Sequence, residues 1–117
     1  MIFNLNLLAE KINSTAHKLG WYDNGERNFG EVIALMHSEL SEALEEWRNG
    51  NGLDVVYFEE VEGSRLRKPE GVPVELADCL IRILDTMHEI GVDIEYVVGQ
   101  KMAYNNNRPY RHGGKLA

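Results

Sequence analysis

Two stretches of the sequence carry acidic side chains at helical spacing. Glu39, Glu42 and Glu46 belong to the first stretch, and Glu75 and Asp78 belong to the second. A helix turns by about 100° per residue, so residues three or four apart lie on one side of it. In both stretches this side borders an apolar face, where carboxylates are costly unless a cation lies between them. If the two helices pack face to face, the carboxylates converge. The pattern then predicts a magnesium site, because Mg²⁺ prefers oxygen ligands.

The first acidic stretch is expected to be a helix over 28–48. Asn28 followed three residues later by Glu31 is typical of a helix N-cap. Apolar residues then recur at helical spacing and define one face of the helix. These residues are Val32, Ile33, Met36, Leu40, Ala43, Leu44 and Trp47.

The second acidic stretch is expected to be a helix over about 74–90. Pro73 suits a first helical position, and Gly91 follows the end. The single cysteine, Cys79, is expected to be a small buried hydrophobe rather than a reactive thiol. The apolar face comprises Leu76, Cys79, Leu80, Ile83, Met87 and Ile90, and one edge of it carries Glu75, Asp78, Arg82 and Asp85.

The rest of the chain supplies two further helices and one ambiguous segment. Apolar periodicity predicts a helix over 4–19, and Asp93 is a suitable N-cap for a helix to about Asn105. Residues 53–72 leave two alternatives open, a small hairpin or an irregular excursion. The expected class is all-α: a four-helix-bundle-type domain with a short irregular or hairpin insertion between its second and third helices.

Length and charge limit the possible functions. A chain of 117 residues is long enough for one domain with its own core. No apolar run reaches the length of a membrane span and the start lacks the pattern of a signal peptide, so we expect a cytoplasmic protein that binds no membrane. The net charge of −7 argues against binding of a nucleic-acid polymer. Residues 101–117, by contrast, hold basic and no acidic side chains, which suits a small polyanion bound beside a metal.

Other kinds of catalytic site lack support in the sequence. A ferritin-like di-iron site needs Glu-x-x-His motifs, and the nearest pattern is Asp85-x-x-His88, whose histidine turns away from the acidic edge. No Ser/His/Asp order, zinc-ligand spacing or glycine-rich phosphate loop is present. His17 and His37 are most simply surface residues.

Several segments together match the pattern of a known family. They are Ser38-Glu39-Leu-Ser-Glu42 followed by Glu45-Glu46, Glu75-Leu-Ala-Asp78, and the ranges 30–35, 101–105 and 108–115. On these residues the chain resembles the MazG-like nucleoside triphosphate pyrophosphohydrolases of the all-α NTP pyrophosphatase superfamily, over most of 21–117 outside the insertion at 53–68. The family's first motif commonly opens with two glutamates, and Ser38 stands at the first of these positions. The number of bound ions, one or two, therefore stays open.

The resemblance implies a single MazG-like all-α NTP pyrophosphatase domain over 1–117. Its reaction would be attack of a metal-activated water on the α-phosphorus of a (deoxy)nucleoside triphosphate, releasing pyrophosphate and the monophosphate. Glu46 is a candidate to orient that water, and the alternative is that it is a plain structural acid. Two alternatives remain: a phosphoribosyl-nucleotide pyrophosphohydrolase of the same superfamily, and a non-catalytic helical adaptor. The implied ligands of Mg²⁺, or of Mn²⁺ as its substitute, are Glu39, Glu42, Glu75 and Asp78.

Residues outside the acidic stretches are candidates for substrate contact. Trp21 and Tyr22 lie in a polar loop before the first acidic helix, where the pair would either stack on a base or cover the end of the core. Positions four apart on the last helix share one face. The residues expected to contact the phosphates are Lys101, Asn105, Arg108, Arg111 and Lys115.

The third helix carries apolar residues on more than one side. Ala77 and Ile81 lie away from its main apolar face, as Leu35 does on the second helix. A helix that is apolar nearly all round is usually buried on both sides. Four short helices can hardly achieve this within one subunit, so we expect a homo-oligomer, either a dimer or a tetramer.

Overall fold

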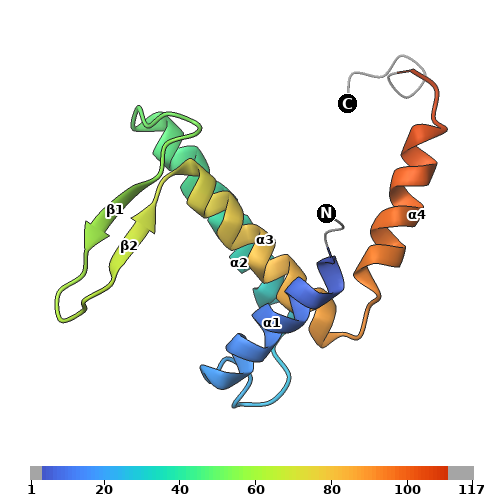
Figure 1. Ribbon diagram of the computed structural model, residues 1–117, viewed down its shortest axis with the longest axis horizontal. Helices are drawn as coiled ribbons and strands as arrows, with labels where there is room; N and C mark the ends of the chain where they lie inside the picture. The colour runs from blue at the N-terminus through green and yellow to red at the C-terminus, as the bar shows by residue number, and fades with distance from the viewer. Residues whose placement is uncertain (1–3, 111–117) are drawn as a thin grey trace.

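The computed structural model of the protein describes residues 4–110 (Figure 1). This part of the chain is mostly helical, as predicted, and the insertion forms a two-stranded antiparallel hairpin. The elements in chain order are α1 (Leu5–Lys18), α2 (Phe29–Arg48), β1 (Tyr57–Glu60), β2 (Arg67–Glu70), α3 (Val72–Glu89) and α4 (Ile94–Asn106).

The helices begin where the sequence places their caps. The Asn28 side chain accepts a hydrogen bond from the backbone N–H of Glu31 at the start of α2. Asp93 does the same for the N–H of Tyr96 at the start of α4. Pro73 lies in the first turn of α3, where its missing N–H costs nothing. These local signals explain why the helix boundaries could be predicted closely.

The helices α2 and α3 lie side by side and are joined through the hairpin, so they run antiparallel (Figure 1). The buried residues of α2 are Val32, Glu39 and Ala43. Those of α3 include Glu75 and Cys79, and Cys79 is buried as predicted. This helix pair therefore encloses carboxylates as well as small apolar side chains.

The apolar core lies where α1 crosses α3 and meets the start of α4. Its fully buried residues are Ala9, Leu84 and Ile94, with partly buried aliphatic residues packed around them. The Asn6 side chain accepts a 2.8 Å hydrogen bond from the N–H of Ile94 and donates to Asp93. The first helix thereby fixes the start of α4.

The expected four-helix bundle is not formed within the described part of one chain. Helix α4 leads away from the α2–α3 pair (Figure 1) and packs chiefly against α1. The radius of gyration is 17.3 Å, compared with about 13 Å for a compact chain of this length.

The predicted apolar faces of α2 and α3 are only partly covered within the described part of one chain. These faces stay exposed because no other described element covers the far side of the α2–α3 pair. Exposed fractions there reach 51% for Leu80 and 56% for Trp47. The exposed members of the predicted faces are Leu40, Leu44 and Trp47 on α2, and Leu76, Leu80, Ile83 and Ile90 on α3. Within residues 4–110, no helix is both long enough and apolar enough to cross a membrane.

Candidate metal centre

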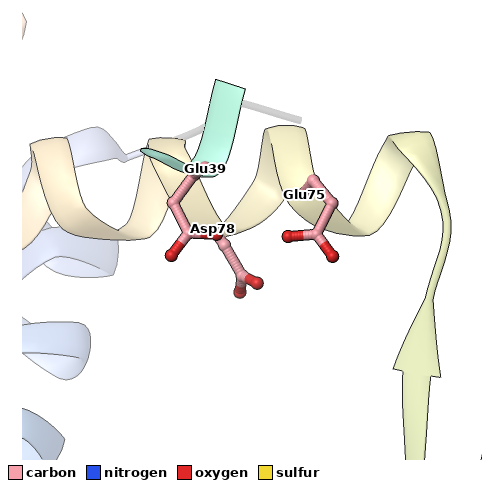
Figure 2. Close-up of side chains that lie close together, drawn as sticks. All are labelled: Glu39, Glu75 and Asp78. Carbon is pink, nitrogen blue, oxygen red and sulfur yellow. The ribbon is translucent and has the colours of Figure 1, made fainter. Parts of the chain in front are cut away.

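Three of the predicted metal ligands meet between α2 and α3. Glu39 from α2 and Glu75 and Asp78 from α3 each offer a carboxylate oxygen, and these oxygens lie within 4.8 Å of one another. Figure 2 shows the three side chains gathered on one side of α3. Glu39 and Glu75 are only 7% and 6% exposed. The helix pair therefore holds like charges together in a site that is largely removed from water.

The electrostatics of this group fit a divalent cation. Burial first, and then the neighbouring Glu42, Glu39 and Asp78, raise the pKa of Glu75 to about 8. Burial and the charge of Glu39 also raise the pKa of Asp78. The buried Oε2 of Glu75 has no hydrogen-bond partner among the described residues. An orphaned oxygen in a set of hard oxygen donors matches the ligands that Mg²⁺ takes.

Glu42, the fourth predicted ligand, lies at the border of the group. It is exposed, and it does not belong to the three residues whose oxygens approach one another most closely. Its carboxylate is nevertheless near enough to Glu75 to raise the pKa of that residue. A ligand role for Glu42 therefore requires only a local side-chain movement.

Arg82 supplies positive charge at the site. Its Nε donates a 3.0 Å hydrogen bond to Oε1 of Glu39, and both side chains are largely buried. The sequence placed Arg82 on the acidic edge of its helix but assigned it no role. In the structure it offsets part of the repulsion among the carboxylates.

Glu46 lies in an adjoining acidic group with Glu70 and Glu75, whose oxygens are again within 4.8 Å of one another. Tyr57 donates a 2.8 Å hydrogen bond to Oε1 of Glu46, and Asn51 donates to Oε2. The hydrogen bond to Glu46, together with burial, raises the pKa of Tyr57 to about 12, so the phenol remains a donor. Glu46 is thus held in place by the hairpin and the segment before it.

A pocket of about 500 Å³ opens beside the metal ligands. Glu39 and Asp78 form part of its wall, together with residues of α1 and of the loop between α1 and α2. Trp21 lines it and is 48% exposed. The guanidinium groups of Arg27 and Arg82 lie 5.4 Å and 5.7 Å from its ring centroid. The pocket therefore joins an aromatic surface and two cations to the acidic group.

The two aromatic residues of this loop have different surroundings. Tyr22 donates a 2.7 Å hydrogen bond to the buried Asp85 and stacks on His17, with ring centroids 4.4 Å apart. His17 also contacts Glu89 at 2.7 Å, so it is more than a simple surface residue. Tyr22 covers the core, whereas Trp21 remains available to a ligand. Stacking of Trp21 on a base stays a prediction.

The predicted phosphate contacts lie apart from the acidic group in one chain. Lys101, Asn105 and Arg108 belong to the α4 region, and none of them lines the pocket. Lys101 and Arg108 flank the Tyr104 ring, at 4.9 Å and 5.6 Å. Arg111 and Lys115 lie outside the described residues. Within the described residues, Lys101 and Arg108 therefore make no contact with the site of their own subunit.

Sequence reasoning missed three residues that the fold brings to the site. Arg27 lines the pocket, and its position six residues after Trp21 in the same loop was the available signal. Tyr57 and Glu70 reach the adjoining group only because they are paired across the hairpin. No short-range pattern in the sequence indicates that pairing.

Comparison with known proteins gives no significant similarity: no family model, curated protein or solved structure matches the chain. The acidic groups and the pocket beside them are therefore the features that indicate a function.

Proposed function

We propose that the protein is a MazG-like, Mg²⁺-dependent nucleoside triphosphate pyrophosphohydrolase. The observation that carries this proposal is the meeting of Glu39, Glu75 and Asp78 beside a pocket that Glu39 and Asp78 line together with Trp21. A buried cluster of hard oxygen ligands suits a magnesium-bound polyphosphate. An exposed aromatic ring with cations beside it suits a nucleobase and the remaining phosphate charge.

The residues that would hold the metal are Glu39, Glu42, Glu75 and Asp78. When bound, Mg²⁺ would lower the pKa of the attacking water and offset the charge that develops on the leaving group. The water oxygen would form a bond to the α-phosphorus while the bond from that phosphorus to the α–β bridging oxygen breaks. The products are the nucleoside monophosphate, pyrophosphate and a proton.

The chain's own side chains would bind and orient the substrate. Trp21 would stack on the base, and Arg27, whose guanidinium lies 5.4 Å from the Trp21 ring centroid, would contact the phosphates. Arg82 would share its charge between Glu39 and the substrate. Glu46, kept as an acceptor by Tyr57 and Asn51, would orient the water.

The active form in this proposal is a homo-oligomer, either a dimer or a tetramer. The exposed apolar side of the α2–α3 pair and the protruding α4 are features that assembly of two copies would cover. In such an assembly, Lys101, Asn105 and Arg108 of one subunit would approach the phosphates bound by another. Arg111 and Lys115 would extend this contact.

The test is hydrolysis of a nucleotide panel by protein freed of metal with EDTA and then supplied with Mg²⁺. Reaction in ¹⁸O-labelled water identifies the phosphorus that is attacked, and we expect the label only in the monophosphate. Turnover of phosphoribosyl-nucleotides alone would favour the related pyrophosphohydrolase. No Mg²⁺-dependent turnover of any nucleotide would replace the proposal with the helical adaptor.

A further inference from the structure

The hairpin carries an acidic residue into contact with the helix pair. Glu70, the last residue of β2, has a carboxylate oxygen within 4.8 Å of oxygens of Glu46 and Glu75. It stands opposite Tyr57 in the strand register. Paired residues of an antiparallel hairpin point to the same face, and Tyr57 bonds Glu46 from that face. Two residues of the insertion thus converge on one side chain of α2.

The base of the hairpin holds Glu70 firmly. Gly71, the next residue, is buried and has φ of +124°. A Cβ on Gly71 would overlap the backbone oxygen of Val55. The segment before β1 and the end of β2 therefore pass in close contact. The position of Glu70 relative to α3 therefore follows from the backbone itself and not from a flexible side chain alone.

Glu75 belongs to both acidic groups. Its side chain is 6% exposed, and its buried Oε2 has no hydrogen-bond partner in the described part of the chain. In Figure 2 its two oxygens diverge, one toward Glu39 and Asp78 and the other toward the side on which β2 joins α3. A carboxylate with this arrangement can bind one cation with each oxygen.

The positive charge near the second group is insufficient to neutralise it. Lys68 forms a 3.0 Å ion pair with Glu70, but its side chain is 64% exposed and such pairs contribute little. Glu46 has two hydrogen-bond donors that carry no charge, Tyr57 and Asn51. Among the described residues, three carboxyl groups whose oxygens lie within 4.8 Å of one another therefore share one solvated lysine, which favours the binding of a further cation.

We propose that Glu46, Glu70 and Glu75 form a second divalent-cation site, that Glu75 bridges it to the first, and that the hairpin exists in part to supply Glu70. Two-metal sites hold their ions about 3.5–4 Å apart, a spacing that a bridging carboxylate supports. The cation is of the Mg²⁺ or Mn²⁺ class, because all ligands are carboxylate oxygens. The site's catalytic meaning rests on the proposed function, but its existence does not.

The experiment is titration of the metal-free protein with Mn²⁺ alone, followed by calorimetry and electron paramagnetic resonance. We expect two ions per subunit and a spin-coupled spectrum at saturation. Glu70→Gln should weaken the second site at least tenfold and leave the spectrum of an isolated ion. Glu60→Gln is the matched control, since it removes an exposed acid from the same hairpin and should bind two ions.

A single ion in the wild-type protein, or two coupled ions in Glu70→Gln at unchanged affinity, overturns the inference. If Glu70→Gln does not fold, Lys68→Ala gives the decision: removing the competing cation should tighten the second site, and unchanged Mn²⁺ binding counts against it. The two proposals fail separately. Two coupled ions without pyrophosphate release refute only the proposed function, and release with one bound ion refutes only the second site.

Discussion

At the scale of single residues, Glu75 is the residue on which the chemistry depends. The sequence indicates its position, because Glu75 and Asp78 lie three apart beside an apolar face. It does not indicate its protonation state. The high pKa comes from burial and from Glu42 and Glu39, which are more than thirty residues away in the chain. Spacing along one helix indicates candidate ligands, whereas the charge of these ligands depends on the carboxylates that the second helix places beside them.

This raised pKa predicts that metal binding releases protons. At pH 7 a carboxyl with a pKa of about 8 is protonated, and it must ionise to bind a cation. We expect release of about one proton per subunit at pH 7, falling toward none at pH 9. Calorimetry in buffers of different ionisation enthalpy measures it. Glu75→Gln should show no such release from this position, and a release that is independent of pH would contradict the assignment.

The same shift predicts how the stability of the metal-free protein depends on pH. The folded state retains a proton on Glu75 up to about pH 8, whereas the unfolded chain loses it near pH 4.5. The stabilisation of the folded state by the proton on Glu75 is therefore complete below pH 4.5 and is lost as the pH rises to about 8. Urea unfolding with EDTA present should show a free energy of unfolding that falls across this window. In Glu75→Gln the fall should be smaller.

Asp78→Asn tests whether the acids act as one metal site. Turnover should fall by about a hundredfold or more, because the variant loses a ligand of the ion that stabilises the transition state. The fold should keep its melting temperature or gain slightly, since one of several crowded like charges is removed. Steady-state kinetics and thermal unfolding measure both. Glu45→Gln changes an exposed acid of α2 outside the groups and should match the wild type; near-wild-type activity of Asp78→Asn would refute the site.

At the scale of elements, the helices were predictable and the hairpin register was not. Helix periodicity reflects a buried side, and the caps Asn28 and Asp93 are local signals. Six of the eight residues of β1 and β2 are exposed and the other two are half-buried, so no alternation of buried apolar residues marks their pairing. Because the contribution of Tyr57 and Glu70 to the site depends on that pairing, it could not be predicted from the sequence.

Gly71→Ala tests the rigid base of the hairpin. The new methyl group would overlap the backbone oxygen of Val55 and force an unfavourable positive φ, a cost of about 1–3 kcal/mol. Urea unfolding measures the loss, and Mn²⁺ titration should show weaker binding through displaced Glu70. Gly63→Ala at the hairpin tip has a positive φ but no atom within 4 Å. It should cost less and leave Mn²⁺ binding unchanged, and equal effects of the two variants would contradict this account.

At the scale of the whole molecule, residues 4–110 of a single chain leave an apolar surface of α2 and α3 open. Leu44 on α2 is 46% exposed and Leu80 on α3 is 51% exposed. Periodicity predicted that these residues face a partner, but it could not tell whether that partner is in the same chain. Because α4 extends away from the α2–α3 pair, residues 4–110 of one chain do not supply that partner. The apolar pattern of a helix predicts which side is buried. It does not predict whether the residues that cover that side belong to the same subunit or to another.

Assembly through this surface predicts a concentration-independent oligomer at micromolar protein. Sedimentation should give a dimer or tetramer for the wild type. Leu80→Glu should shift it toward monomer, because a charge at a buried apolar contact is costly. Leu66→Glu on the hairpin, where the leucine is 79% exposed, is the control and should not change the assembly. A wild-type monomer with full activity would exclude the oligomer.

If α4 acts on a neighbouring subunit, two impaired variants should complement each other. Lys101→Ala should lower kcat/KM about tenfold, equivalent to about 1.4 kcal/mol of transition-state binding. In this arrangement Lys101 of each subunit serves the acids of its partner. A hybrid dimer of one Lys101→Ala subunit and one Asp78→Asn subunit therefore contains one intact site and one site with both substitutions. Random mixing of subunits should then restore about a quarter of wild-type activity. If Lys101 served its own subunit, every site in the mixture would carry one substitution, and the activity would not exceed the mean of the separate variants.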